Sequence, residues 1–243
     1  MTDIVSAVNK DYDDACVLID QQRYEEARQL LLPLVEKIRD FPLSEDTDWK
    51  DFERLPDALV YSACFGDADA GRKLVIHPLH PARILFTLGS LLIEMGRPDE
   101  ALEPLQMLLV YDPVCPKYLF ELGDAYKRVG MVHDAYSSAS WALSFAANDE
   151  ELARCYRDLG YCLAEMGSYE DAAMLNLLSL RYRLSRHAQE ELDWLRKNHG
   201  VSADNFSEEM IRSRCGELGI QIGMSDVMRI IVSTLEKLPK KDE

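Results

Sequence analysis

The stretch that decides the fold is residues 85–105, which read LFTLGSLLIEMGRPDEALEPL. Two glycines lie seven residues apart, Gly89 and Gly96, and Ala101 follows five residues later. Apolar residues recur at helical intervals before Gly96, which predicts an amphipathic helix with Gly89 on its apolar face, where a missing Cβ lets a partner helix approach. Gly96 is expected to end this helix, because glycine tolerates the left-handed backbone conformation. Pro98 is a favourable first residue for a second helix, in which Ala101 would allow a close crossing.

The same offsets occur in three clear copies and in one weaker copy. The small residues of the clear copies are Gly89, Gly96 and Ala101, then Gly123, Gly130 and Ala135, then Gly160, Gly167 and Ala172, and the weaker copy has Ala15, Gln22 and Ala27. The large apolar residues before the second glycine are Leu85, Leu88 and Leu92, then Leu119, Leu122 and Tyr126, then Tyr156, Leu159 and Leu163. The clear copies follow one another after 34 and 37 residues, so each copy is predicted to be one helix-turn-helix unit.

This pattern resembles the tetratricopeptide repeat, a helix-turn-helix unit of about 34 residues. The resemblance covers residues 82 to about 186 and is weaker in the N-terminal copy, where Asp11 and Asp14 stand in apolar positions. It also departs from the family where Ala147 replaces the closing proline and Asn176 fills a large apolar position. The resemblance implies an all-α, right-handed α-solenoid of such repeats, of bacterial type, with C-terminal capping helices.

Four segments are expected along the chain. They are a degenerate N-terminal helical hairpin at residues 1–40, an irregular helical insert with an extended loop at 41–81, three repeats at 82–186, and capping helices at 187–243. Within the insert, residues 49–66 are predicted to form a helix interrupted by Pro56, and residues 72–81 are predicted to be extended because proline disfavours a helical conformation in the residue before it. The last two helices are predicted from Ser207 to Leu218 and from Ser225 to Leu238.

Charge and composition exclude several classes of function. The 43 acidic residues against 27 basic ones give a formal charge of −16, which repels nucleic acid and anionic membranes. No stretch approaches the roughly 18 apolar residues of a spanning helix, and six cysteines without a visible export signal favour a cytoplasmic location. No G-x-S-x-G, H-E-x-x-H or Gly-rich phosphate motif is present. We therefore expect no catalytic residues, no cofactor and no metal, since His77 and His80 lack the further ligands that a metal site needs.

In tetratricopeptide proteins, the first helices of successive repeats line a concave groove that usually holds a peptide of a partner protein. The resemblance maps this groove onto three sets of residues, each on one helix face. The sets are Arg83, Phe86 and Ser90, then Lys117, Phe120, Asp124 and Lys127, then Arg154, Arg157 and Tyr161. Five cations and one acid in a concavity of an acidic protein would focus its field on an anionic ligand. The implied function is a scaffold that binds an acidic peptide or partner protein, although these cations could instead pair with acids of neighbouring helices.

Two other interpretations remain open. Residues 154–162 read RCYRDLGYC, and cationic neighbours lower the pKa of a thiol, so Cys155 or Cys162 could belong to a regulatory, redox-sensing protein. A buried structural thiol is the simpler interpretation of both cysteines. Alternatively, the chain could self-associate as a homodimer, or its groove could be filled by its own loop of residues 72–80.

Overall fold

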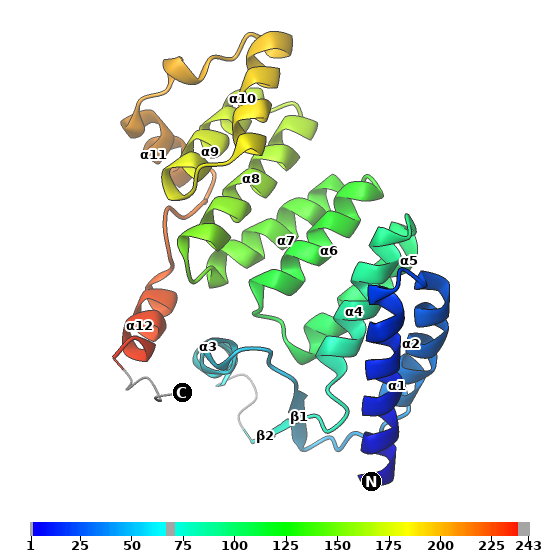
Figure 1. Cartoon of the computed structure of the whole chain (residues 1–243). Coiled ribbons are helices and arrows are strands. Elements are labelled where there is room, and N and C mark those ends of the chain that lie inside the picture. Colours follow the sequence, from blue (N-terminus) through cyan, green and yellow to red (C-terminus); the bar gives the residue numbers. More distant parts are fainter. Residues whose placement is uncertain (1, 67–70, 238–243) are drawn as a thin grey trace. The chain divides into compact units, whose positions relative to one another are not determined.

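The computed structural model describes residues 2–66 and 71–237, and Figure 1 shows their helices and strands. The chain divides into two compact units, Met1–Val129 and Gly130–Glu243, which we call unit 1 and unit 2. Helices dominate both units, as the repeat pattern predicts. No helix in the described part of the chain is long and apolar enough to cross a membrane.

Unit 1 consists of helical hairpins joined by a mixed segment. Its elements are α1 (Thr2–Asp20), α2 (Tyr24–Arg39), β1 (Thr47–Lys50), α3 (Leu55–Phe65), β2 (Lys73–Ile76), α4 (Pro81–Glu94), α5 (Pro98–Tyr111) and α6 (Pro116–Arg128). Helix α1 packs on α2 and α4 on α5, while α2 also contacts α4, and α6 contacts α5. The weaker N-terminal copy therefore forms a hairpin, and its small residues Ala15 and Ala27 are fully buried.

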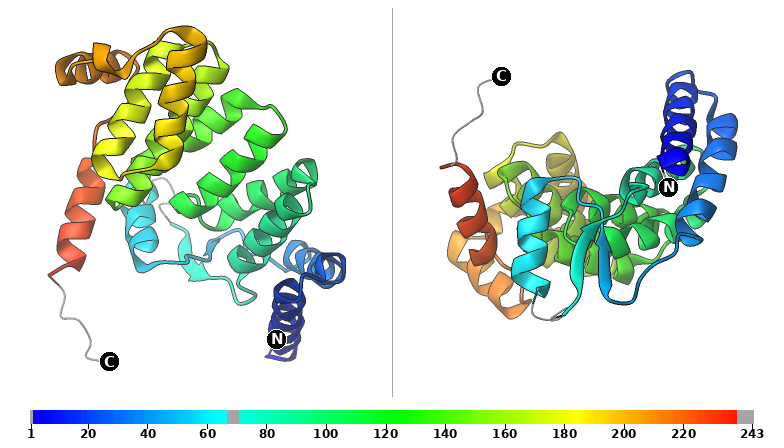
Figure 2. Two further views of the ribbon diagram at one scale, coloured as in Figure 1. Left: turned by 45° about the horizontal axis from the view of Figure 1, so that its top comes forward. Right: turned by 90° about the horizontal axis from the view of Figure 1, so that it is seen from below.

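The mixed segment between the hairpins contains a two-stranded parallel sheet. Strands β1 and β2 pair from Thr47 opposite Lys73 to Lys50 opposite Ile76, and Figure 2 shows them side by side next to α3. The end of β1 is fastened to α5, because the Lys50 ammonium group donates to the carbonyl of Val110 at 2.9 Å. This sheet is a small addition to an otherwise helical fold.

The sheet corrects one expectation and confirms another. The predicted helix over residues 49–66 is wrong at its start, since the helix begins at Leu55. Pro56 lies in the first turn instead of interrupting the helix, and a missing N–H there breaks no hydrogen bond. The predicted extended conformation of residues 72–81 is confirmed only for β2, Lys73–Ile76, because residues 78–79 form a turn, His80 has a left-handed backbone and α4 begins at Pro81.

Unit 2 contains α7, the hairpin of α8 and α9, and the C-terminal helices. Its elements are α7 (Val132–Phe145), α8 (Asp149–Glu165), α9 (Tyr169–Tyr182), α10 (Arg186–His199), a short 3₁₀ helix (Ala203–Asn205), α11 (Glu208–Glu217) and α12 (Asp226–Leu235). Helix α8 packs between α7 and α9, and α10 packs on α9. The last two helices lie close to where the sequence predicts them, but α12 ends at Leu235, before the predicted end at Leu238, which is outside the described residues.

The C-terminal segment is fastened to α7, α8 and α9 by polar contacts. Arg214 of α11 binds the carboxylate of Asp171 through two hydrogen bonds of 2.7 and 3.0 Å. The Tyr156 hydroxyl donates to the carbonyl of Gln221 at 3.0 Å and accepts the N–H of Gly223 at 2.8 Å. Both sets of contacts hold the polypeptide after α10 against the helices that precede it.

The glycines have the two roles that the sequence predicts. A Cβ on Gly89 would lie 2.5 Å from Leu105, and one on Gly160 would lie 2.8 Å from the Asn176 amide and 3.2 Å from the carbonyl oxygen of Ala172. These glycines therefore let α4 approach α5 and α8 approach α9. The glycines that end helices have positive φ angles, as predicted: Gly96 (73°), Gly130 (78°) and Gly167 (84°).

We expect Gly160→Ala to destabilise the protein, because the added methyl group must push against a backbone carbonyl that cannot rotate away. The cost should be about 1–3 kcal/mol of unfolding free energy, as for other overpacked sites. Gly216→Ala is the matched control, because Gly216 lies within α11 with no atom near a new Cβ, and a helical Gly→Ala change gains about 0.5–1 kcal/mol. Urea unfolding followed by circular dichroism measures both, and equal stability of the two variants would contradict a close crossing at Gly160.

Candidate functional site

Unit 1 contains two adjoining pockets on the faces of α1, α4 and α6. Their volumes are about 420 and 470 Å³, and Phe86 and Thr87 of α4 line both of them. Tyr12 of α1 and residues 51–53, which follow β1, line the first pocket, and Ile19 of α1 lines the second. We call the two pockets together the α4 groove. Its helical walls come from α1 and α4, which each begin a hairpin, and from α6, which follows the second hairpin. The repeat resemblance implies this arrangement.

Most of the groove residues predicted in unit 1 line these pockets. Arg83, Phe86 and Lys117 line the first pocket, and Phe86, Ser90 and Asp124 line the second. Phe120 is buried with 6% of its surface exposed. Lys127 is not among the lining residues, and its ammonium group lies 2.5 Å from the Asp124 carboxylate. The contributions of α1 and of residues 51–53 could not be predicted from the repeat pattern, because the N-terminal copy is degenerate and the insert lies outside the repeat.

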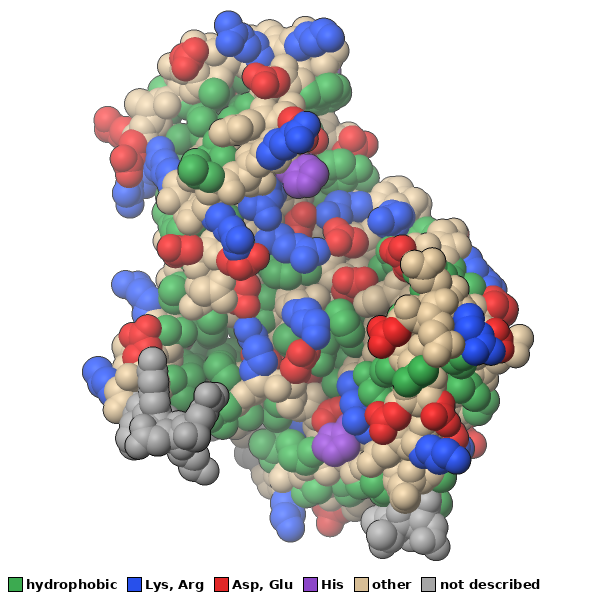
Figure 3. Space-filling model, in the orientation of Figure 1, with side chains coloured by type: hydrophobic (Ala, Val, Ile, Leu, Met, Phe, Trp, Pro, Cys, Tyr) green, Lys and Arg blue, Asp and Glu red, His purple; other side chains and the backbone are tan. Residues whose placement is uncertain are grey.

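The predicted cations of unit 1 already have partners. The Arg83 guanidinium donates to the Asn9 side-chain oxygen at 2.5 Å and lies 4.6 Å from the centre of the Tyr12 ring. Lys117 donates to both Glu53 oxygens at 2.8 and 3.1 Å and lies 4.2 Å from the centre of the Phe86 ring. Lys117 is therefore paired with an acid of the insert, whereas Arg83 is held by a neutral amide and an aromatic ring. Figure 3 shows acidic side chains beside basic ones on the visible face.

Ionisation of the groove follows from these contacts. Burial acts to raise the pKa of Glu53, but hydrogen bonds from Lys117 and Tyr118 outweigh burial and lower that pKa overall. Burial also raises the pKa of Tyr118. The Oγ atom of Ser90 is buried and lacks a hydrogen-bond partner among the described residues. The groove therefore offers aromatic surface, the unsatisfied hydroxyl of Ser90 and an ion pair between Lys117 and Glu53.

The two histidines of the insert have separate environments. His77 is fully buried among the rings of Phe41, Trp49 and Tyr111, with centroid distances of 4.4, 5.7 and 5.5 Å. Its Nδ1 accepts the N–H of Leu79 at 3.2 Å, and burial lowers its pKa to about 4. His77 is thus a neutral core residue with no role in the groove.

His80 instead lies at the edge of the α4 groove. Its Nδ1 is 3.0 Å from Asp51, whose other oxygen accepts the N–H of Ala82 at the start of α4 at 2.8 Å. Of the predicted groove-filling loop, residues 72–80, only His80 is among the residues that line the two pockets. Since residues 73–76 pair with β1, this loop borders the groove and leaves its volume open.

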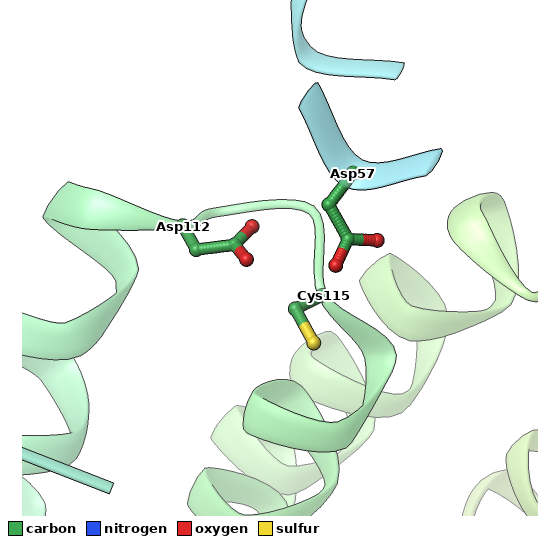
Figure 4. A group of neighbouring side chains, drawn as sticks. All are labelled: Asp57, Asp112 and Cys115. Atoms are coloured by element: carbon green, nitrogen blue, oxygen red, sulfur yellow. The ribbon is translucent and has the colours of Figure 1, made fainter. Parts of the chain in front are cut away.

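Three buried side chains in unit 1 have the donor types and spacing of metal ligands. The ligand atoms of Asp57, Asp112 and Cys115 all lie within 4.8 Å of one another, and Figure 4 shows the three side chains converging from α3 and the loop before α6. However, Arg54 binds Asp57 at 2.7 Å, and Asp112 accepts the N–H groups of two neighbouring backbone segments. These contacts account for both carboxylates, and we assign the cluster a structural role that ties the insert to α5 and α6.

Burial and the charge of Asp57 raise the pKa of Asp112 to about 7. Burial raises the pKa of Cys115 as well, which keeps its thiol protonated. This cluster has no signal in the sequence, because Asp57 belongs to the insert and the other two residues belong to the repeat array, with no local pattern to connect them.

In unit 2 the predicted site residues lie on one face of α8. Arg154, Arg157 and Tyr161 are half-buried, whereas Cys155 and Cys162 on the opposite face are fully buried. Burial raises the pKa of Cys155 well above that of a free thiol, and the charge of Asp158 acts in the same direction. A reactive thiolate needs a lowered pKa and access to solvent. The geometry of Cys155 therefore gives no support to redox sensing.

Comparison with known proteins identifies the fold. No protein-family model matches the chain, and no curated protein matches its sequence. The chain is similar to a solved structure of MamA, with a TM-score of 0.58 and 12% identity over 89% of this chain and 97% of that one. It is also similar to a putative kinesin light chain from Podosopora anserina with nearly identical TPR-like repeats, with a TM-score of 0.54 and 16% identity over 96% of this chain and 99% of that one. The fold is an all-α solenoid of the tetratricopeptide-repeat type.

The raised pKa of Asp112 predicts a pH dependence of stability. An aspartate with a pKa of about 7 in the native state and about 3.9 in the unfolded state loses stabilisation as the pH rises through this window. Asp112→Asn removes that loss, so we expect the stability of the variant relative to wild type to increase between about pH 4 and pH 7, by at most about 1.4 kcal/mol per pH unit.

Urea unfolding at a series of pH values measures this difference. His77, whose pKa is lowered to about 4, contributes the opposite slope in both proteins and cancels from it. The exposed Asp193 provides the control Asp193→Asn, for which the difference should not vary with pH. A flat difference for Asp112→Asn would show that this carboxyl group is not protonated in the native state.

Proposed function

We propose that this protein is a scaffold that binds a segment of a partner protein in the α4 groove, without catalysis and without a cofactor. The observation that carries the proposal is the pair of adjoining pockets that share Phe86 and Thr87 along the faces of α1, α4 and α6. Solenoid repeats build extended surfaces of this kind for partner binding. Protein interfaces are centred on a few aromatic or apolar anchors in pockets, and the half-buried Phe86 ring offers such a contact.

The lining of the groove indicates what the bound segment needs. Phe86 and Ile19 favour an apolar side chain, and the unpartnered Ser90 hydroxyl favours a hydrogen-bond acceptor or donor beside it. We propose an acidic character for the partner as well, although Arg83 and Lys117 of the groove already have partners and the support comes from α8 in unit 2. No disulfide joins the six cysteines, which is consistent with the cytoplasmic location that we propose. Formation of a homodimer stays a prediction that sedimentation equilibrium would measure.

Affinity capture with a groove variant tests the proposal. Immobilised wild-type protein is incubated with a lysate of the organism that supplies the sequence, and bound proteins are identified by mass spectrometry. Phe86→Ala removes the ring that both pockets share, and we expect the captured partner to bind about thirtyfold more weakly, the effect of losing an anchor worth about 2 kcal/mol.

Trp141→Ala is the matched control, because Trp141 is an exposed aromatic residue of α7 in unit 2. Circular dichroism confirms that both variants keep their helices. A partner that binds wild type and Phe86→Ala equally well would place the interface outside the α4 groove and overturn the proposal. Loss of the partner from Trp141→Ala alone would place the interface in unit 2.

A further inference from the structure

Arg157 is a half-buried cation without a fixed counterion. It lies on the exposed face of α8, one turn after Arg154. Among the described residues, no side chain or carbonyl forms an ion pair or hydrogen bond with its guanidinium group. This sets Arg157 apart from Arg83 and Lys117 of unit 1, whose donors are engaged with Asn9 and Glu53.

Two further arginines, Arg154 and Arg183, act on the charge of Arg157. Arg154 lies 3.6 Å from the Asp158 carboxylate, and Arg183, which follows α9, is paired with Glu150 at the start of α8. The carboxylates of Asp158 and Glu150 are thus each engaged by an arginine other than Arg157. Burial lowers the pKa of Arg157, and the charges of Arg154 and Arg183 lower it further against the opposing effect of Asp158. A buried charge in such surroundings is stabilised when an anion arrives.

We propose that Arg157, with Arg154 and Arg183 beside it, binds a side-chain carboxylate of an acidic protein segment. This inference rests on the proposed scaffold function and specifies the chemistry of its partner. A guanidinium group binds a carboxylate through two parallel hydrogen bonds, and such charge-assisted pairs are about twice as strong as neutral ones. The ring of Tyr161, one turn further along the same face, adds apolar surface next to the bound carboxylate.

A protein ligand fits this site better than a nucleic acid. One guanidinium group without an ion pair among the described residues suits one or two carboxylates, whereas a phosphate backbone needs many cations and the chain carries a formal charge of −16. Figure 3 shows Lys and Arg side chains gathered over the region of α8, with acidic side chains among them and not in a continuous basic tract. This mixed surface recognises isolated carboxylates.

Fluorescence anisotropy with defined peptides tests the site in the full-length protein. The probe is a fluorescein-labelled peptide in which two glutamates alternate with leucine and phenylalanine, and its analogue with glutamines is the matched control peptide. We expect saturable binding of the glutamate peptide only, and a loss of about tenfold or more in affinity for Arg157→Gln, because a charged hydrogen-bonded pair is removed. Arg157→Lys should recover part of this loss, since lysine keeps the charge but not the paired donors.

Arg212→Gln is the matched control variant, because it makes the same charge change on the exposed face of α11, and it should bind like wild type. Equal affinity of wild type and Arg157→Gln, or equal affinity for the two peptides, would overturn the carboxylate site. Tighter binding of an oligothymidine would overturn the choice of a protein ligand. If the captured partner is lost from Phe86→Ala but retained by Arg157→Gln, the scaffold function stands and the Arg157 site is wrong.

Discussion

The close crossing of the two helices in a hairpin is the constraint on which the rest of the structure depends. Gly160 has no Cβ at the crossing point, so α8 lies against α9 at a distance that any larger residue would increase. This packing buries one face of α8: Tyr156 and Leu159 are fully buried, while Arg157 between them stays half-exposed. Tight packing thus decides which side chains remain available to a partner. The α4 groove in unit 1 arises in the same way, because α4 buries its other face against α5.

The repeat array could be predicted from the sequence because its signals are local. Glycine offsets and apolar spacing within some 20 residues specify each hairpin. Asn176, which fills a large apolar position of the repeat, is accommodated because its amide donates to the carbonyl of Ala172 one turn earlier at 3.0 Å. The insert could not be predicted in the same way. Strand β1 forms because Thr47–Lys50 pairs with Lys73–Ile76. No short-range pattern in residues 49–66 predicts this pairing with a segment more than 20 residues away.

The site was predictable to the same extent as the repeat. Family positions identified Arg83, Phe86 and Ser90 on the groove, since a helix face follows directly from the register of the apolar residues. Electrostatics could not be predicted from that register. Glu53 neutralises Lys117 from the insert, whose position no repeat specifies, and Arg183 reaches the charges of α8 from the end of α9. Of the predicted groove cations, Arg157 is therefore the one that we propose as a binding site.

An arginine without an ion pair among the described residues, such as Arg157, gives selectivity in an acidic protein because two electrostatic effects oppose each other. The formal charge of −16 repels strongly anionic molecules, and screening restricts this repulsion to about 8 Å at physiological ionic strength. A segment with one or two carboxylates is repelled only weakly by the net charge, and it gains hydrogen bonds to Arg157 at short range. In a nucleic acid or a long acidic tract, every negative charge that does not bind an arginine is repelled by the negatively charged protein. The balance therefore favours an isolated acidic side chain flanked by apolar residues, whose burial supplies the affinity that one ion pair does not.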